Sequence, residues 1–256
     1  MNYMNLSLAW MGALNMALAL YGCTNGIETG LSAPEGIPVT VLAEISPVTK
    51  SGEAVSSDNG FDRTSFLSGD QIKVTRTKKA SGTAASQSAS YRYDGTSAWT
   101  VVGTSPVTLE PAVTYSAQFP ADYSAINQFQ TTSAAYLASN LLKTGDATSS
   151  DGTLDFTSSG KPFTHVNSKL TLMFTVKRET SIANDAVTVA ATGIRTAVST
   201  NQTITLYRPY PGDASRKYEW CGILRAVGGS AGTSATDLTV SLTCDGVTNK
   251  ATLTGC

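Results

Sequence analysis

The chain has 256 residues, of which 14% are charged, and its formal net charge at pH 7 is -1. Binding to nucleic acid needs a broad basic surface, and the short basic run at residues 76–79 is too small to provide one. The composition therefore argues against a nucleic-acid partner. The many Ser, Thr, Ala and Gly residues are typical of extracellular β-proteins, and the length suits one large domain or two small ones.

An apolar stretch begins at Met4 and ends just before Cys23. A secretory signal has an apolar segment of about 7–15 residues that ends in small residues at the cleavage site. Leu20, Gly22 and Cys23 resemble a bacterial lipobox. That resemblance implies a signal peptide at residues 1–22 and an acyl chain such as palmitate on Cys23, the new N-terminus. The alternative is an ordinary cleaved signal followed by an unrelated cysteine.

Residues 23–36 contain Gly and Pro without periodic apolar positions, which indicates a flexible tether. From residue 37 the pattern changes, because residues 37–45 have an apolar side chain at every odd position and predict a half-buried strand. Many short strands at regular spacing are typical of β-sandwiches. Further strands are predicted at residues 71–75, 90–93, 99–102, 114–119, 170–176, 187–189, 203–207, 221–224 and 238–242.

Two segments interrupt the series of strands. Residues 131–145 begin with hydroxyl side chains and end with Lys143 and a glycine, which predicts a short helix over the open end of the first sandwich. A second break, at residues 178–181, predicts a domain boundary. We therefore expect an all-β protein with one sandwich at residues 37–180 and another at 181–256.

Several motifs occur in the order found in one known family. Residues 66–74, FLSGDQIKV, resemble the W/F-x-x-G-D-x-I-x-V segment of the fimbrillin family, the subunits of type V pili and related surface lipoproteins. Residues 91–99 resemble its tyrosine, glycine and tryptophan hairpin. Residues 115–120 resemble its Y-x-A-x-Y-P motif, and residues 162–170 its F-x-H-x-x-A-K-L motif. The similarity spans residues 37–177.

The resemblance implies two tandem transthyretin-like β-sandwiches behind a lipid anchor. In polymerising members a protease cuts after a basic residue in the loop that follows the first strand. Removal of that strand opens a groove, which a strand of a neighbouring subunit fills. The matching position is Lys50, with Arg63 as the second candidate for cleavage. The alternative is that both are ordinary exposed loop cations.

The implied function is that of a non-enzymatic, lipid-anchored pilus subunit of the outer membrane. It would assemble with other pilin subunits by strand exchange and adhere to host or bacterial surfaces. The alternative is a monomeric surface lipoprotein that binds carbohydrate or another ligand. For that role Tyr91, Tyr93 and Trp99 would form an exposed aromatic platform, although such residues on a hairpin also pack into cores.

Cys221 and Cys244 lie almost symmetrically about the flexible stretch at residues 228–234. In an antiparallel hairpin this symmetry would bring them opposite one another, so a disulfide can form in an oxidising compartment. Two buried thiols are the alternative.

No catalytic, metal or cofactor site is expected. The G-x-S-x-G pattern at residues 228–232 is followed by a predicted strand, whereas a nucleophile elbow needs a helix there. The chain's one histidine, His165, lies before that serine in the sequence and cannot build a zinc site by itself. The aspartates at positions 146, 151 and 155 do not have the spacing of an EF-hand loop.

Overall fold

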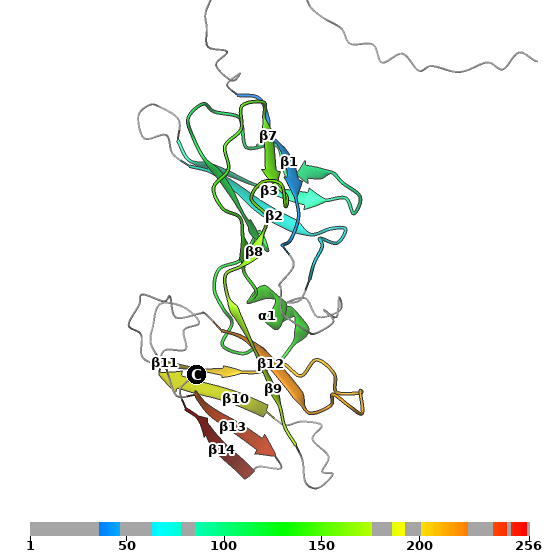
Figure 1. Cartoon of the computed structure of the whole chain (residues 1–256), viewed down its shortest axis with the longest axis vertical. Helices are drawn as coiled ribbons and strands as arrows, with labels where there is room; N and C mark the ends of the chain where they lie inside the picture. The colour runs from blue at the N-terminus through cyan, green and yellow to red at the C-terminus, as the bar shows by residue number, and fades with distance from the viewer. Residues whose placement is uncertain are drawn as a thin grey trace, which may run out of the picture. The chain divides into compact units, whose positions relative to one another are not determined.

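The computed structural model describes residues 36–46, 63–77, 85–175, 186–192, 201–224, 238–244 and 247–254. Within these ranges the chain forms fourteen β-strands and one short helix, shown in Figure 1. The all-β fold predicted from the alternation of apolar residues is therefore confirmed. Ala33–Cys256 form one compact unit, and residues 1–35 lie outside the described part of the chain.

The larger sheet of the first core has six antiparallel strands. In β2 (Gln71–Arg76), Ile72 and Val74 are fully buried while Lys73 between them is exposed, as expected for a strand with one face on the core. The order across the sheet is β4 (Trp99–Val101), β3 (Gln87–Tyr93), β2, β5 (Tyr115–Phe119), β6 (Leu142–Lys143) and β8 (Thr164–His165).

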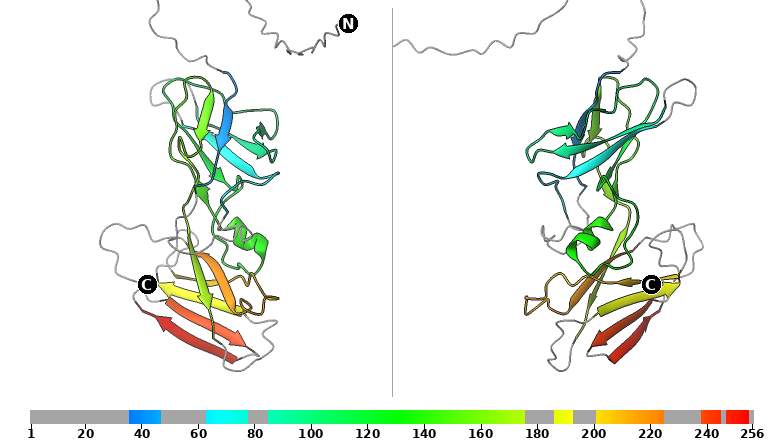
Figure 2. Two further views of the ribbon diagram at one scale, coloured as in Figure 1. Left: turned by 45° about the vertical axis from the view of Figure 1, so that its right-hand side comes forward. Right: turned by 180° about the vertical axis from the view of Figure 1, so that it is seen from behind.

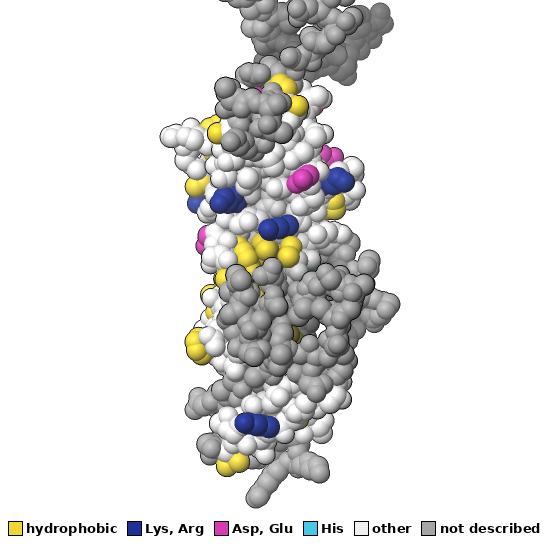
Figure 3. Space-filling view, turned by 90° about the vertical axis from the view of Figure 1, so that its left-hand side faces the viewer, with side chains coloured by type: hydrophobic (Ala, Val, Ile, Leu, Met, Phe, Trp, Pro, Cys, Tyr) yellow, Lys and Arg dark blue, Asp and Glu magenta, His cyan; other side chains and the backbone are white. Residues whose placement is uncertain are grey.

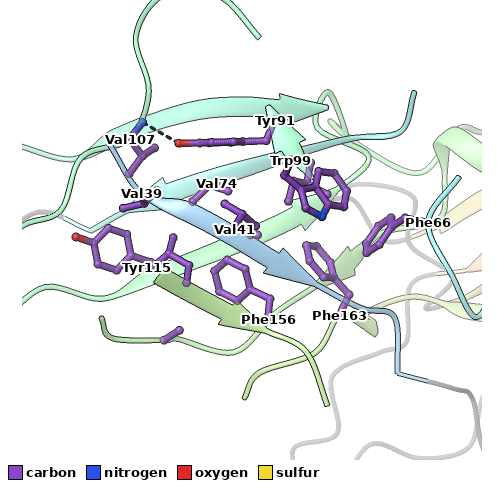
Figure 4. Packing of buried hydrophobic residues seen from close by; sticks show 14 of the residues in the cluster. Val39, Val41, Phe66, Val74, Tyr91, Trp99, Val107, Tyr115, Phe156 and Phe163 are labelled. Carbon is purple, nitrogen blue, oxygen red and sulfur yellow. Dashed lines mark hydrogen bonds between the residues drawn. The ribbon is translucent and has the colours of Figure 1, made fainter. Parts of the chain in front are cut away.

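A second, two-stranded sheet closes this core from the other side. It consists of β1 (Thr40–Ala43) and β7 (Thr153–Phe156), which run parallel with Val41 opposite Leu154. Figure 4 shows side chains of both layers meeting between the sheets. The first core is thus a β-sandwich whose thinner layer consists of only two strands.

The second core lies among strands from the later part of the chain, seen from two sides in Figure 2. Its buried side chains include Ile204 from the larger, antiparallel sheet and Trp220 from a separate pair of strands. The strand order is β11 (Asn201–Thr205), β10 (Ala186–Thr192), β13 (Leu238–Cys244) and β14 (Val247–Leu253). The separate pair is β12 (Glu219–Leu224) with β9 (Ser168–Met173).

The expected division at residue 181 does not separate the strand pairs. β9 falls within the predicted first domain, yet all six of its residues pair with β12 from the predicted second domain. Residues 176–185, which contain the expected boundary itself, lie outside the described residues. The description of the chain as two tandem domains stays a prediction.

The helix α1 (Ser133–Ala138) is shorter than predicted. It begins after Thr132, whose hydroxyl accepts a hydrogen bond from the Ala135 N–H at 3.2 Å. The predicted helix extended to residue 145, but Leu142 is 1% exposed and pairs with Phe119 in the first sheet. Burial in the sheet outweighs helix propensity at this position. The helix also packs Tyr136 against β12, not over the first sandwich.

Candidate functional site

The first strand segment, residues 36–46, is the part of the fold on which the predicted assembly depends. It is paired on both sides through its backbone. Before β1, the Val39 N–H donates to the Val107 carbonyl at 3.0 Å, and along β1 the Thr40 N–H donates to the Gly152 carbonyl at 2.8 Å. After β1, the Ser46 N–H donates to the Phe163 carbonyl at 2.8 Å. The segment is therefore held along its whole length.

From residue 38 onward, the side chains of this segment alternate between core and solvent, as its sequence predicted. Val39, Val41 and Ile45 are only 5%, 2% and 3% exposed and Leu42 is 43% exposed, whereas Ile37, which the alternation also placed on the core face, is 45% exposed. Figure 4 shows Val39 and Val41 pointing from β1 into the cluster that contains Val74, Tyr115 and Phe156. Each buried aliphatic side chain of this kind stabilises a fold by about 1.5–3 kcal/mol. Loss of the segment would therefore leave an apolar groove.

Of the two predicted processing residues, the structure describes only Arg63. Lys50 lies outside the described residues, as does the lipidation candidate Cys23. Arg63 is not the exposed loop cation that the alternative interpretation assumed. Its guanidinium donates two hydrogen bonds to the Asp70 carboxylate, at 2.7 and 3.3 Å, and lies 5.4 Å from the centre of the Phe119 ring.

The expected exposed aromatic platform is wrong. Tyr91 and Trp99 are 2% and 9% exposed and belong to the first core, and Tyr93 packs against it with its ring 5.0 Å from that of Trp99. The Val107 N–H donates to the Tyr91 hydroxyl at 3.1 Å. Burial raises the pKa of Tyr91, and the hydrogen bond from Val107 opposes this shift in part. These rings pack inward because β3 and β4, which form the hairpin, are strands of the larger sheet and have one face on the core.

The hairpin expected to join Cys221 and Cys244 is also wrong. Cys221 lies in β12, which pairs with β9, while Cys244 lies in β13, which pairs with β10 and β14. The symmetry of the two cysteines about residues 228–234 did not decide the pairing, because β12 pairs with β9, a strand much earlier in the chain. The structure has Cys221 as a buried thiol.

The described residues contain no group of three or more His, Cys, Asp and Glu side chains placed to hold a metal ion. The Nδ1 atom of His165 lies 3.0 Å from the Asn140 amide oxygen. Asp151 and Asp155 each accept hydrogen bonds from their own turns, first from the Thr153 N–H and the Thr157 hydroxyl respectively, and these bonds lower the pKa of both carboxyl groups. Their oxygen atoms organise turns.

None of the described helical residues forms a helix long and apolar enough to cross a membrane. On the face drawn in Figure 3, charged side chains are few and lie apart on a mainly uncharged surface. The described residues on that face form no broad basic area of the kind that nucleic acid requires.

Sequence reasoning missed the role of Asp70. Besides the pair with Arg63, its carboxylate accepts the Leu67 N–H at 2.7 Å, and its own N–H donates to the Leu67 carbonyl at 3.0 Å. The preceding Gly69 has a φ of +90°, which favours glycine. The Gly-Asp pair within the FLSGDQIKV motif was the available signal, because Asp commonly organises the turn that precedes a strand.

Several solved structures are similar to this chain, and three of them are a fimbrial protein and two proposed cell adhesion proteins. The sequence matches no family model and no curated protein. A fimbrial protein from Bacteroides ovatus has a TM-score of 0.42 and 15% identity over 88% of this chain, which spans about half (48%) of that protein's length. A proposed cell adhesion protein from Parabacteroides distasonis has a TM-score of 0.49 and 12% sequence identity, over 86% of this chain and 80% of that protein. Another proposed cell adhesion protein, from Bacteroides fragilis, has a TM-score of 0.45 and 15% sequence identity, over 86% of this chain and 88% of that protein. Such identities do not transfer a residue's role between chains.

Proposed function

We propose that this chain is a non-enzymatic, cell-surface pilus subunit that is made as a lipid-anchored precursor and assembles by strand exchange. The observation that supports this proposal most directly is the construction of residues 36–46. This segment completes the first core with three buried side chains, yet it is joined covalently to the rest of the core only through residues 47–62. A single cut in that connection leaves it held by non-covalent contacts alone.

In this proposal the cut falls after Lys50. Residues 23–50 then leave together with the lipid on Cys23, which had held the precursor at the outer membrane. The vacated groove exposes side chains of the first core, among them Leu154, Phe156 and Phe163. A strand from a neighbouring subunit enters, forms backbone hydrogen bonds with β7 and places alternate apolar side chains where Val39 and Val41 had been. Such a fibre would present its subunits to host or bacterial surfaces.

The structure does not favour the carbohydrate-binding alternative. That alternative relied on an exposed platform of Tyr91, Tyr93 and Trp99, and Tyr91 and Trp99 are buried in the first core. A Trp99→Ala variant would therefore remove a core side chain, and a loss of glycan binding in it would report damaged packing as readily as a lost contact.

The proposal can be tested by cutting the full chain at one engineered position. A recognition sequence for a highly specific viral protease is inserted directly after Lys50, and the purified chain is cut and freed from residues 23–50 in mild denaturant. After return to native buffer, we expect polymers that resist sodium dodecyl sulfate, visible as a ladder on unheated gels. The strands in such polymers are held by many cooperative hydrogen bonds, as in other strand-addition complexes.

Two controls define the outcome. The same chain without the recognition sequence, taken through the same steps, should stay monomeric because its own first strand still fills the groove. A trimmed chain that has lost residues 23–50, by mass spectrometry, and is still monomeric at high concentration would contradict assembly by strand exchange between copies of this chain.

A further inference from the structure

Arg63 is the first described residue after the connection in which the proposed processing falls, and its side chain is held from two directions. The Asp70 carboxylate accepts hydrogen bonds from both terminal guanidinium nitrogens, while the centre of the Phe119 ring lies 5.4 Å from the guanidinium carbon. Arg63 and Asp70 retain only 15% and 16% of their side-chain exposure. Planar, two-point pairs of this kind are among the stronger polar contacts in proteins.

Both partners of Arg63 are themselves fixed by the first core. The Asp70 carbonyl accepts the Tyr93 N–H at 2.9 Å, which ties this residue to β3. Phe119 packs edge-on against Phe66 with 5.5 Å between ring centres, and Phe66 is in turn 5.0 Å from Trp99. The arginine is therefore held by the rigid end of a sandwich and not by another mobile surface group.

The two residues that follow Arg63 are open to solvent, in contrast to the Arg63 side chain. Thr64 and Ser65 are both exposed. An endoprotease that cuts after arginine must take the arginine side chain into a deep pocket of its own, and exposed loops are its usual substrates. At this bond the contacts of the Arg63 side chain decide whether the protease can bind.

We propose that Asp70 protects the Arg63–Thr64 bond from proteases that cut after basic residues and thereby directs processing to Lys50. The proposal rests on the proposed function for its biological meaning, although the protection itself does not depend on assembly. A cut at Arg63 would place the new N-terminus at Thr64, two residues before Phe66, whose ring helps to close the core. Asp70 thus acts through the position of Arg63 and determines the specificity of maturation.

The test is limited digestion of the full chain with an arginine-specific endoprotease, with products identified by mass spectrometry. In the native chain we expect the fragment that begins at Thr64 to form slowly compared with its rate in the unfolded chain. Asp70→Asn keeps an oxygen for the Leu67 N–H but loses the charge that binds Arg63. Because proteolysis follows the population of the open form, we expect cleavage at Arg63 to rise by about tenfold or more.

Asp122→Asn is the matched control, because Asp122 is an exposed carboxylate beside the same depression as Asp70 and Phe119. This control should keep Arg63 protected. Equal cleavage at Arg63 in the native chain and in Asp70→Asn would overturn the proposal. So would a rise at every arginine in Asp70→Asn, which would report general unfolding. Neither result bears on whether the trimmed chain polymerises, so failure here is distinct from failure of the proposed function.

Discussion

Asp94 organises the turn between β3 and β4 by itself. One of its carboxylate oxygens accepts the N–H groups of Thr96, Ser97 and Ala98 at 2.7, 3.0 and 3.1 Å, and the other accepts the Thr96 hydroxyl at 2.8 Å. The next residue, Gly95, has a φ of +94° and lies so close to Ser68 that a Cβ would come within 2.8 Å of the Ser68 side chain. Neither residue of this turn is easily replaced.

These hydrogen bonds favour the ionised carboxylate and lower the pKa of Asp94 from 3.8 to about 2, with the bond from the Thr96 N–H as the largest cause. A lowered pKa in the folded state stabilises the fold above the unfolded value, and this stabilisation is lost as the pH falls from about 4 through 2. We predict that the difference in melting temperature between the native chain and Asp94→Asn is largest near pH 6 and disappears near pH 2. Thermal unfolding followed by circular dichroism at several pH values measures it.

Asp94→Asn is a suitable comparison, because the Asn side chain keeps an amide oxygen that can accept the hydrogen bonds of the turn but has no carboxyl group that titrates. If the stability difference did not change between pH 2 and pH 6, the pKa of Asp94 would not be lowered by folding.

At this scale the sequence predicted the turn but not the ion pair. Asp-Gly between two alternating segments indicates a hairpin by local chemistry alone, and β3 and β4 do pair across it. The contact of Arg63 with Asp70 and Phe119 depends on where β2 and β5 lie side by side. No local pattern carries that information.

Among the elements, β12 has an edge that is completed by a side chain. Gln130 is fully buried, and its amide oxygen accepts the Ile223 N–H at 2.7 Å while its amide nitrogen donates to the Ile223 carbonyl at 2.9 Å. The amide thus takes the place of a neighbouring strand at this residue. The adjacent Gly222 lies close to the Leu206 side chain, so that any Cβ there would overlap it.

We predict that Gln130→Ala lowers the free energy of unfolding by about 3 kcal/mol, because two buried backbone groups of Ile223 lose their partner. Chemical denaturation measures this loss, and hydrogen exchange should show the Ile223 amide exchanging faster. Gln128→Ala is the matched control: Gln128 is exposed in the same segment, and the change expected is within about 0.5 kcal/mol. Equal effects of the two substitutions would contradict the role of Gln130.

A strand or helix can be predicted from the sequence when neighbouring residues determine it, and not when it depends on contacts with distant parts of the chain. The alternation at residues 37–45 and 71–75 correctly predicted β1 and β2, since each has one face on the core. The partner of β9 was not predictable from alternation, because β12 is about fifty residues away and antiparallel pairing is open to any strand with a matching face. The predicted end of the helix, at residue 145, was wrong because Leu142 lies in a strand of the first sheet.

For the molecule as a whole, the proposed assembly makes the first strand a replaceable part. We predict that a synthetic peptide of residues 37–46 binds the trimmed chain and prevents formation of its polymers. The same peptide with Val41→Asp should bind at least about tenfold more weakly, because it places a charge in the core, whereas Leu42→Asp should bind almost as well, since Leu42 faces solvent. Fluorescence anisotropy of labelled peptides measures the affinities.

Two outcomes would contradict this prediction. Equal binding of the two substituted peptides would mean that the peptide does not occupy the place of β1. Binding without any effect on polymers would mean that assembly uses another surface.

The chain passes more than once between the first core and the strands around the second. Ile126 and Tyr136 pack in a separate cluster with Cys221 and Ile223 of β12, residues 142–163 return to the first core, and β9 then leaves again to pair with β12. A fragment that ended at residue 180 would carry β9 without its partner, and one that began at 181 would lose the cover of Gln130. In a fibre under tension, a pulling force would therefore be shared by three covalent crossings and by the β9–β12 ladder, which would resist in shear.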